Sequence, residues 1–349
     1  RKILETKTQQ LLSSSLSSGN GVMRKVLIIG DSTVDYNFMT TPLKEIFDND
    51  VIDLQFVGTR GDTDKKHEGR SGWKYSDYAG NSRKLTKVLI AGITNVPSFG
   101  SIYSNNDSTW LCQEVNVNAG TGYLKFEKID GVNEMLTSGT LLKVSGSGDS
   151  SVNYSGASID EGNPFYNPTT ATFDIQHYLT QTNQTLGNGD WIFFQLGIND
   201  VFSIQTLLEA KNKVDSIMTD INSFISNIHG FNSNIRIGFS ITIPPANQDG
   251  FGANYGLGQL SELYKKTGLL ELQSRLIETF DNDTSRANNI FLISNHANID
   301  MVYNIPKEDV QVNSRNTTTI SMSVNGVHPT TTGYAQIADM YAGIIKFFS

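Results

Sequence analysis

Short, mainly apolar runs recur along the chain at wide intervals. Four of them stand out, and a fifth, weaker run covers residues 51–57. The four are Val26–Ile29, Trp191–Leu196, Ile235–Ile241 and Ile290–Ile293. Apolar runs without regular polar alternation are typical of strands buried on both faces of a parallel sheet. We therefore predict a central parallel sheet of about five strands.

Helical patterns occupy the stretches between these strands. Residues 204–228 carry apolar residues at i, i+3, i+4 and i+7 spacing, which predicts one buried face. That face would include Leu207, Leu208, Val214, Ile217, Met218, Ile221, Phe224, Ile225 and Ile228. Residues 257–280 and 331–348 show similar stripes. Strands that alternate with helices predict a doubly wound α/β fold with right-handed crossovers.

Residues 82–160 interrupt this alternation. Four short strand-like segments, "KVLIAGI", "TWLCQEVNV", "GYLKFEKI" and "TLLKVSG", are separated by Gly, Asn and Ser. This pattern predicts a small β-rich, antiparallel insertion. We therefore predict one α/β domain over residues 23–349, with the insertion inside it.

Residues 1–22 differ from both patterns. A weak apolar stripe over positions 3–16 is followed by the Ser/Gly-rich "SSSLSSGNG", which is typical of a linker. The segment is interpreted either as a frayed terminus or as the end of a stalk or oligomerisation helix, through which the chain would form a homo-oligomer. The chain begins with Arg1, so we expect it to be a piece of a longer protein.

Composition and charge narrow the classes of partner. The 349-residue chain has a net charge of −8, which argues against nucleic acid because phosphate binding needs a basic surface. The single cysteine, Cys112, excludes an intramolecular disulfide. No segment approaches the roughly 20 apolar residues of a membrane span, and no signal peptide is visible. No metal-ligand spacing appears, so we expect neither a metal nor another cofactor.

Three polar clusters follow or flank the predicted strands. Gly30-Asp31-Ser32 ends the first strand, "LGIND" at 196–200 ends the Trp191 strand, and "NGVHPTTTGY" at 325–334 precedes the last helix. Ligand sites in open α/β sheets lie at the carboxyl ends of the strands, so these clusters should meet at one edge.

The residue types in these clusters suit acyl transfer. A serine hydroxyl such as that of Ser32 becomes a nucleophile when a base removes its proton, and His328 has a suitable ordinary pKa near neutrality. The Asn199 amide and the Ser32 backbone N–H are candidate donors to the oxyanion that develops in the tetrahedral intermediate.

In that order, "GDS", "GIND" and "VHP" resemble the motifs of the SGNH hydrolases, also called GDSL-like esterases. The resemblance extends from about residue 22 to the C-terminus and implies a three-layer α/β/α, flavodoxin-like sandwich. The stretch "HEGRSGW" resembles the carbohydrate O-acetylesterase branch, and "GNPFYN" at 162–167 also resembles a segment of such esterases. The resemblance implies that Gly72 supplies a third oxyanion donor through its N–H.

The chain departs from the family at Asn325, where an aspartate usually stands three residues before the histidine. An amide oxygen can hold the imidazole tautomer, but it has no charge to stabilise the imidazolium. Three outcomes remain open: a Ser-His dyad helped by Asn325 or by a backbone carbonyl, a slow enzyme, or loss of activity.

Other residues near these motifs have simpler interpretations. Asp31 and Asp200 are interpreted as helix caps, and His67 as a residue that shapes the loop around Gly72. Trp73 and Tyr75 are candidates for stacking on a sugar ring, with core packing as the alternative.

We therefore predict a serine esterase that removes acyl groups, with acetyl as the first expectation, from a carbohydrate that is its substrate and partner. One alternative is a lipase or thioesterase for longer acyl chains. The other is a receptor- or glycan-binding module of a phage tail fibre, spike or cell-surface protein. An extracellular, cell-surface or virion-associated location is expected in either case.

Overall fold

A computed structural model describes residue 15 and residues 17–349, apart from 81–84, 99, 106, 132–135, 137, 161 and 257. The helix considered for the N-terminal segment therefore lies outside the described residues. The described chain divides into two compact units. Unit 1 comprises Arg1–Ala79 and Phe173–Ser349, and unit 2 comprises Gly80–Thr172.

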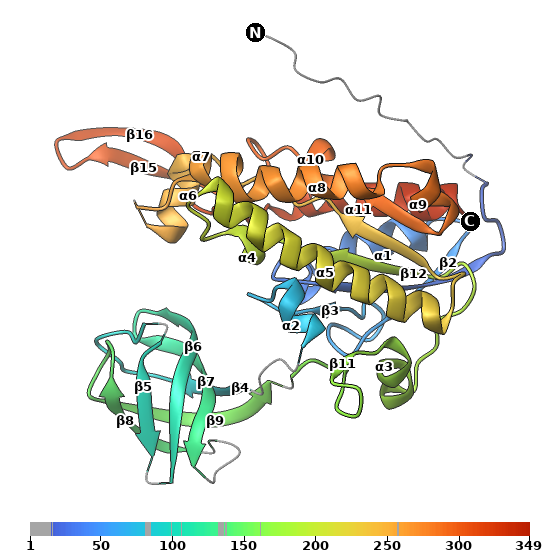
Figure 1. The fold of residues 1–349 in the computed structure, drawn as a ribbon. Helices are drawn as coiled ribbons and strands as arrows, with labels where there is room; N and C mark the ends of the chain where they lie inside the picture. The colour runs from blue at the N-terminus through green and yellow to red at the C-terminus, as the bar shows by residue number, and fades with distance from the viewer. Residues whose placement is uncertain are drawn as a thin grey trace. The chain divides into compact units, whose positions relative to one another are not determined.

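A parallel sheet forms the centre of unit 1 (Figure 1). Its strand order is β14-β13-β12-β1-β2, and the two-residue strand β3 pairs with β1. All of these pairings are parallel, as the apolar runs predicted. The strands are β1 (Met23–Gly30), β2 (Asp53–Val57), β3 (Glu68–Gly69), β12 (Trp191–Gln195), β13 (Arg236–Ser240) and β14 (Ile290–Ile293).

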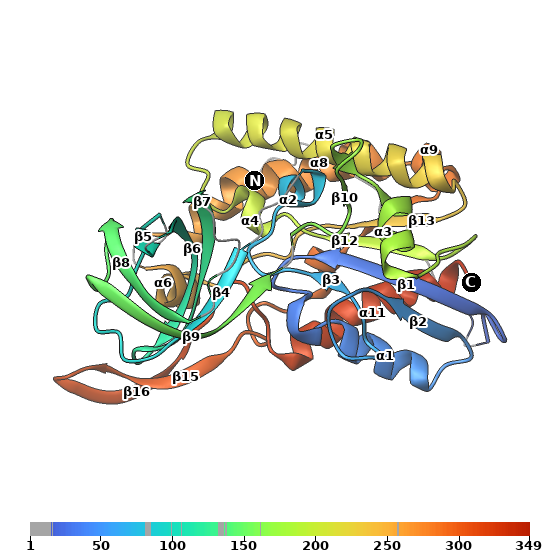
Figure 2. The same cartoon turned by 90° about the horizontal axis from the view of Figure 1, so that it is seen from below.

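Helices cover both faces of this sheet. Helices α5 (Leu207–Phe231) and α8 (Leu270–Phe280) lie on one face, and α1 (Thr40–Asp48) and α11 (Thr331–Phe347) lie on the other (Figure 2). Adjacent residues of β12 point to opposite layers, as strand geometry requires. Phe194 stacks on Phe224 of α5 at 5.2 Å between ring centroids, whereas Phe193 packs edge-on against Tyr341 of α11 at 4.6 Å.

The remaining helices of unit 1 are short and lie in the connections. They are η1 (Asp35–Asn37), α2 (Tyr75–Ala79), α3 (Ile175–Thr182), α4 (Ile198–Val201), α6 (Gln248–Tyr255), α7 (Ser261–Tyr264), η2 (Lys265–Leu269), α9 (Asp283–Ala287) and α10 (Asn295–Asn298). The single helix predicted over 257–280 is instead α7, a π-helical turn η2 and α8 in succession.

Unit 2 is a closed antiparallel barrel rather than a small β segment (Figure 1). Its strands pair in the order β4-β7-β6-β5-β8-β9, and Trp110, Phe126 and Tyr103 lie buried in its own core. The barrel unit is also longer than the predicted insertion of 82–160. Its strands are β4 (Leu85–Ile90), β5 (Ile102–Asn105), β6 (Ser108–Asn118), β7 (Thr121–Gly131), β8 (Gly139–Ser145) and β9 (Ser151–Asp160).

Two pairs of strands lie outside both sheets. The short pair is β10 (Tyr166–Asn167) with β11 (Thr172–Phe173), and the longer hairpin is β15 (Lys307–Asn313) with β16 (Asn316–Ser323). The hairpin extends away from the central sheet of unit 1 (Figure 1). Its strands are largely exposed and polar, so the apolar pattern did not predict them.

The predicted buried face of α5 is wrong at its first turn. Leu207 is 59% exposed and Leu208 is 69% exposed, so the buried stripe begins at Ala210. Thr206 caps the helix in a reciprocal capping box with Glu209, which explains why the helix starts there. Among the described helices, none is both long and apolar enough to cross a bilayer.

Candidate active site

Ser32 and His328 meet at the carboxyl edge of the parallel sheet. Ser32 follows the last residue of β1, and His328 lies in the loop just before α11. The distance from Ser32 Oγ to His328 Nε2 is 2.7 Å, so the hydroxyl can donate to a neutral imidazole. The two residues are 296 positions apart in the chain.

The imidazole of His328 is largely withdrawn from water. Burial lowers the pKa of His328 below its ordinary 6.5, because the charged form loses hydration. The ring is therefore neutral at physiological pH, which is the state that a general base requires.

Gly72 lies in a tight turn beside Ser32. The Trp73 N–H donates to the Arg70 carbonyl at 3.1 Å, and Gly72 occupies the third position of this turn with φ +82°. That left-handed conformation favours glycine. The strand pairing places Gly30 opposite Gly69, and the Arg70 N–H donates to the Gly30 carbonyl at 2.8 Å. The turn therefore starts level with the end of β1.

Asn199 approaches the same turn from the end of β12. Its side-chain Nδ2 donates to the Trp73 carbonyl at 3.1 Å, which leaves a second amide hydrogen on the same nitrogen. The backbone N–H groups of Ser32 and Gly72 have no acceptor within the described part of the chain. Three donors are thus carried by the three segments that surround Ser32.

Two buried carboxylates connect these segments. Asp35, one turn after Ser32, accepts from the Ser71 hydroxyl at 2.9 Å and from its N–H at 3.3 Å. Asp200, which follows Asn199, accepts from the Tyr75 N–H at 3.2 Å. Asp200 therefore holds a distant segment, whereas a helix-capping role was expected. Asp35 was missed by sequence reasoning, because no motif marks an acceptor for a residue 36 positions away.

Burial also alters the acid–base properties of Asp200. Its pKa is raised to about 7, chiefly because the carboxylate loses water, and Lys213 at 3.9 Å opposes that shift.

A buried ion pair supports the loop that carries Gly72. Glu68 accepts from Arg70 Nη1 at 2.6 Å and from the Tyr178 hydroxyl at 2.8 Å. His67 accepts from the Gly69 N–H at 3.0 Å through Nδ1 and contacts Asn37 Oδ1 at 3.1 Å through Nε2. Burial lowers the pKa of His67 to about 4, so the ring is neutral and acts in shaping this loop.

Asn325 does not hold the imidazole ring in the manner considered for it. Its Oδ1 accepts from the N–H of His328 at 2.8 Å and from the N–H of Val327 at 3.1 Å. Within the described residues, no hydrogen bond joins Asn325 to the ring of His328. Asn325 thus orders the backbone that carries His328, because a short side chain reaches its own following N–H groups more readily than a ring beyond them.

Of the two aromatic residues considered for sugar stacking, only Trp73 reaches solvent. Tyr75 is fully buried, so its ring cannot face a ligand in solvent. Trp73 is partly exposed, but its ring lies 4.9 Å from the Arg70 guanidinium and 4.7 Å from the ring of Tyr78.

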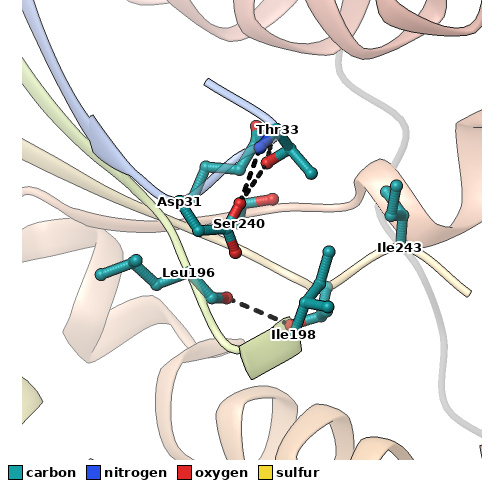
Figure 3. A pocket seen from close by; sticks show the side chains of 8 residues that line it. Asp31, Thr33, Leu196, Ile198, Ser240 and Ile243 are labelled. Atoms are coloured by element: carbon teal, nitrogen blue, oxygen red, sulfur yellow. Dashed lines mark hydrogen bonds between the residues drawn. The ribbon is translucent and has the colours of Figure 1, made fainter. Parts of the chain in front are cut away.

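A small cavity with room for about one water molecule is lined by Asp31 and Thr33, the two chain neighbours of Ser32 (Figure 3). Asp31 is 1% exposed and reaches this cavity from the end of β1. Its Oδ1 accepts from the Thr33 N–H at 2.9 Å and from the Thr33 hydroxyl at 2.7 Å. Its Oδ2 has no hydrogen-bond partner among the described residues. The other lining residues are Gln195, Leu196, Ile198, Ser240, Thr242 and Ile243.

No His, Cys, Asp or Glu cluster able to hold a metal ion occurs among the residues that the structure describes. The arrangement around Ser32 combines a hydroxyl, a neutral base and three N–H donors, which can support nucleophilic attack and hydrogen bonding to an oxyanion.

Comparisons with known proteins give likenesses to five solved chains. No family model matches the chain, and no curated protein matches it. One solved structure, titled "The Structure of a putative arylesterase from Agrobacterium tumefaciens str. C58", has a TM-score of 0.40 and 11% identity, covering 93% of this chain and 98% of that one. A second, titled "Peptidoglycan O-acetylesterase in action, 5 min", has a TM-score of 0.30 and 11% identity, covering 93% and 91%.

Proposed function

We propose that this chain is a serine esterase of SGNH type that removes acyl groups, acetyl in particular, from a carbohydrate. The observation that carries the proposal is the 2.7 Å contact between Ser32 Oγ and His328 Nε2. Such a contact lets the imidazole take the hydroxyl proton as the oxygen attacks an ester carbonyl.

The reaction has two halves. In the first, Ser32 Oγ bonds to the carbonyl carbon while its proton passes to His328. The oxyanion accepts hydrogen bonds from the Ser32 N–H, the Gly72 N–H and the Asn199 amide. His328 then gives the proton to the departing sugar oxygen, and an acyl-serine remains. In the second half, water gives a proton to His328 and attacks the acyl carbon. His328 then returns this proton to Ser32 Oγ as the acyl C–O bond breaks, which releases the carboxylic acid and free Ser32.

Asn325 stabilises the loop around His328 but carries no charge for the imidazolium. In a charged triad, the aspartate stabilises that cation. The proposal is therefore a Ser-His dyad, in which the catalytic contribution of Asn325 is geometric. The choice of acetyl as the acyl group and of a carbohydrate as the alcohol rests on the "HEGRSGW" resemblance. Substrate profiling must test these two parts of the proposal.

The test is acetate release from a panel of acetylated glycans, alongside p-nitrophenyl esters of increasing chain length. We expect Ser32→Ala to lower kcat/KM by roughly 10⁴-fold or more. The matched control is Ser233→Ala, an exposed serine between α5 and β13 at the amino edge of the sheet, which should keep full activity. Equal rates for Ser32→Ala and wild type would refute the proposal, and a preference for long acyl chains would favour a lipase.

A further inference from the structure

Two consecutive residues just after Ser32 have an unfavourable backbone conformation. Tyr36 has φ +61° and Asn37 has φ +62°, in the left-handed region. Asparagine tolerates this region, but a bulky residue there is a genuine outlier. Such strain persists when surrounding contacts enforce it, and it gathers at functional sites.

Specific contacts hold this conformation in place. The Tyr36 N–H donates to Asp35 Oδ1 at 3.0 Å, and Asn37 Oδ1 contacts His67 Nε2 at 3.1 Å. Asp35 and His67 also contact the loop that leads to Gly72. The strained turn is therefore fastened to the loop that carries the Gly72 N–H, one of the three candidate oxyanion donors.

The result of the strain is an exposed pair of aromatic rings. Tyr36 is 60% exposed and Phe38 is 44% exposed, and their ring centroids are 5.8 Å apart. Phe38 in turn stacks on Tyr334 at 5.1 Å with an interplanar angle of 23°. Tyr334 lies in α11, the helix that follows His328, so the pair rests on the segments that carry both Ser32 and His328.

The pair is close to the reacting serine. The Asp35 N–H donates to the Asp31 carbonyl at 3.1 Å, which closes one helical turn that contains Ser32. Tyr36 therefore comes directly after this turn, four residues beyond Ser32 in the chain. Tyr75 is buried and the Trp73 ring is engaged by Arg70, whereas the rings of Tyr36 and Phe38 are open to solvent.

We propose that Tyr36 and Phe38 form a platform on which a sugar ring of the acylated substrate packs while its ester group lies over Ser32. This inference rests on the proposed function and specifies its substrate subsite. The C–H face of a pyranose is apolar and matches an aromatic ring, and the Tyr36 hydroxyl can bond to a ring hydroxyl. Without a ligand, folding gives no reason for a strained turn to hold two aromatic rings in solvent.

The test compares two acetate esters that share a reacting group. One is a monoacetylated methyl pyranoside, and the other is ethyl acetate, which has no ring. The measured quantity is the ratio of kcat/KM for the sugar ester to that for ethyl acetate. We expect Tyr36→Gly and Phe38→Ala each to lower this ratio at least tenfold, and Tyr36→Phe to keep most of it.

The choice of Tyr36→Gly separates the platform from folding. Glycine adopts a positive φ without strain, so this variant should not melt at a lower temperature than wild type. Phe231→Ala is the matched control, since Phe231 is a 38% exposed aromatic residue at the end of α5, at the opposite edge of the sheet from Ser32. It should leave the ratio unchanged.

The outcomes separate this inference from the proposed function. If Tyr36→Gly lowers kcat/KM equally for both esters, or leaves the ratio intact, the platform is refuted. If wild type hydrolyses neither ester, the proposed function fails, and saturation-transfer NMR with the unacetylated methyl pyranoside decides the platform. A transfer signal that Tyr36→Gly abolishes supports it, and equal or absent signals in both proteins overturn it.

Discussion

Asp31 should make the stability of unit 1 depend on pH, and Asp31→Asn should remove that dependence. Asp31 is 1% exposed and lines the small cavity (Figure 3), and its Oδ2 has no hydrogen-bond partner among the described residues. Burial raises its pKa from 3.8 to about 6, against the two opposing hydrogen bonds from Thr33. The folded protein therefore holds this proton to a higher pH than the unfolded chain does.

The magnitude follows from the difference between the two pKa values. A shift from 3.8 to about 6 corresponds to about 3 kcal/mol at roughly 1.4 kcal/mol per unit. Because the folded pKa is the higher one, this stability is fully present below pH 3.8 and is lost as the pH rises through 6. About 2.4 kcal/mol of it should be lost between pH 4 and pH 8.

Urea unfolding of wild type and Asp31→Asn at several pH values tests this directly. Asparagine has no charge at any of these pH values. The unfolding free energy of the variant minus that of wild type should therefore rise by about 2.4 kcal/mol from pH 4 to pH 8. Costs that do not vary with pH, such as an unpaired Asn amide in the cavity, cancel in that comparison. Other titrating groups, including Asp200, cancel in the same way.

The control for this experiment is Ser233→Ala, which changes an exposed side chain that does not titrate. Its difference from wild type should be nearly the same at pH 4 and pH 8. If Asp31→Asn behaves like this control, the Asp31 carboxylate is stabilised in the fold, and the reasoning from burial is wrong.

Three further predictions concern the residues around Ser32. Asn199→Ala should lower kcat by about 10²–10³-fold, the loss expected for one oxyanion donor, and a change in KM alone would contradict that role. Since burial lowers the pKa of His328, the acid limb of kcat/KM should lie below pH 6.5, and a limb above that value would refute the assignment. Asn325→Ala should lower the unfolding free energy by about 1–2 kcal/mol, because two N–H groups lose their acceptor. Asn325→Asp keeps an acceptor there and should lose less than Ala in the same urea measurement.

Much of unit 1 could be predicted from local pattern. The apolar runs correctly marked β1, β12, β13 and β14, since strands covered by helices on both faces must be apolar throughout. The ends of these strands located Ser32 and Asn199, and the last motif located His328. Parallel strands place their carboxyl ends at one edge, so residues 296 positions apart could be expected to meet.

Contacts between distant segments decided the rest. The barrel closes because β4 pairs with both β7 and β9, and such non-local pairings leave little trace in hydrophobic alternation. Leu207 and Leu208 fit the apolar pattern of the helix, yet both are exposed, because the core does not extend to the first turn of α5.

The roles of individual polar and aromatic residues were decided in the same way. The sequence by itself determined which side chains reach the carboxyl edge of the sheet, because local patterns mark where each strand ends and parallel strands share that edge. Only the tertiary structure decided that Tyr75 is buried and that Tyr36 faces solvent. Burial and hydrogen-bond partners depend on what packs from elsewhere in the chain, and no local pattern encodes those neighbours.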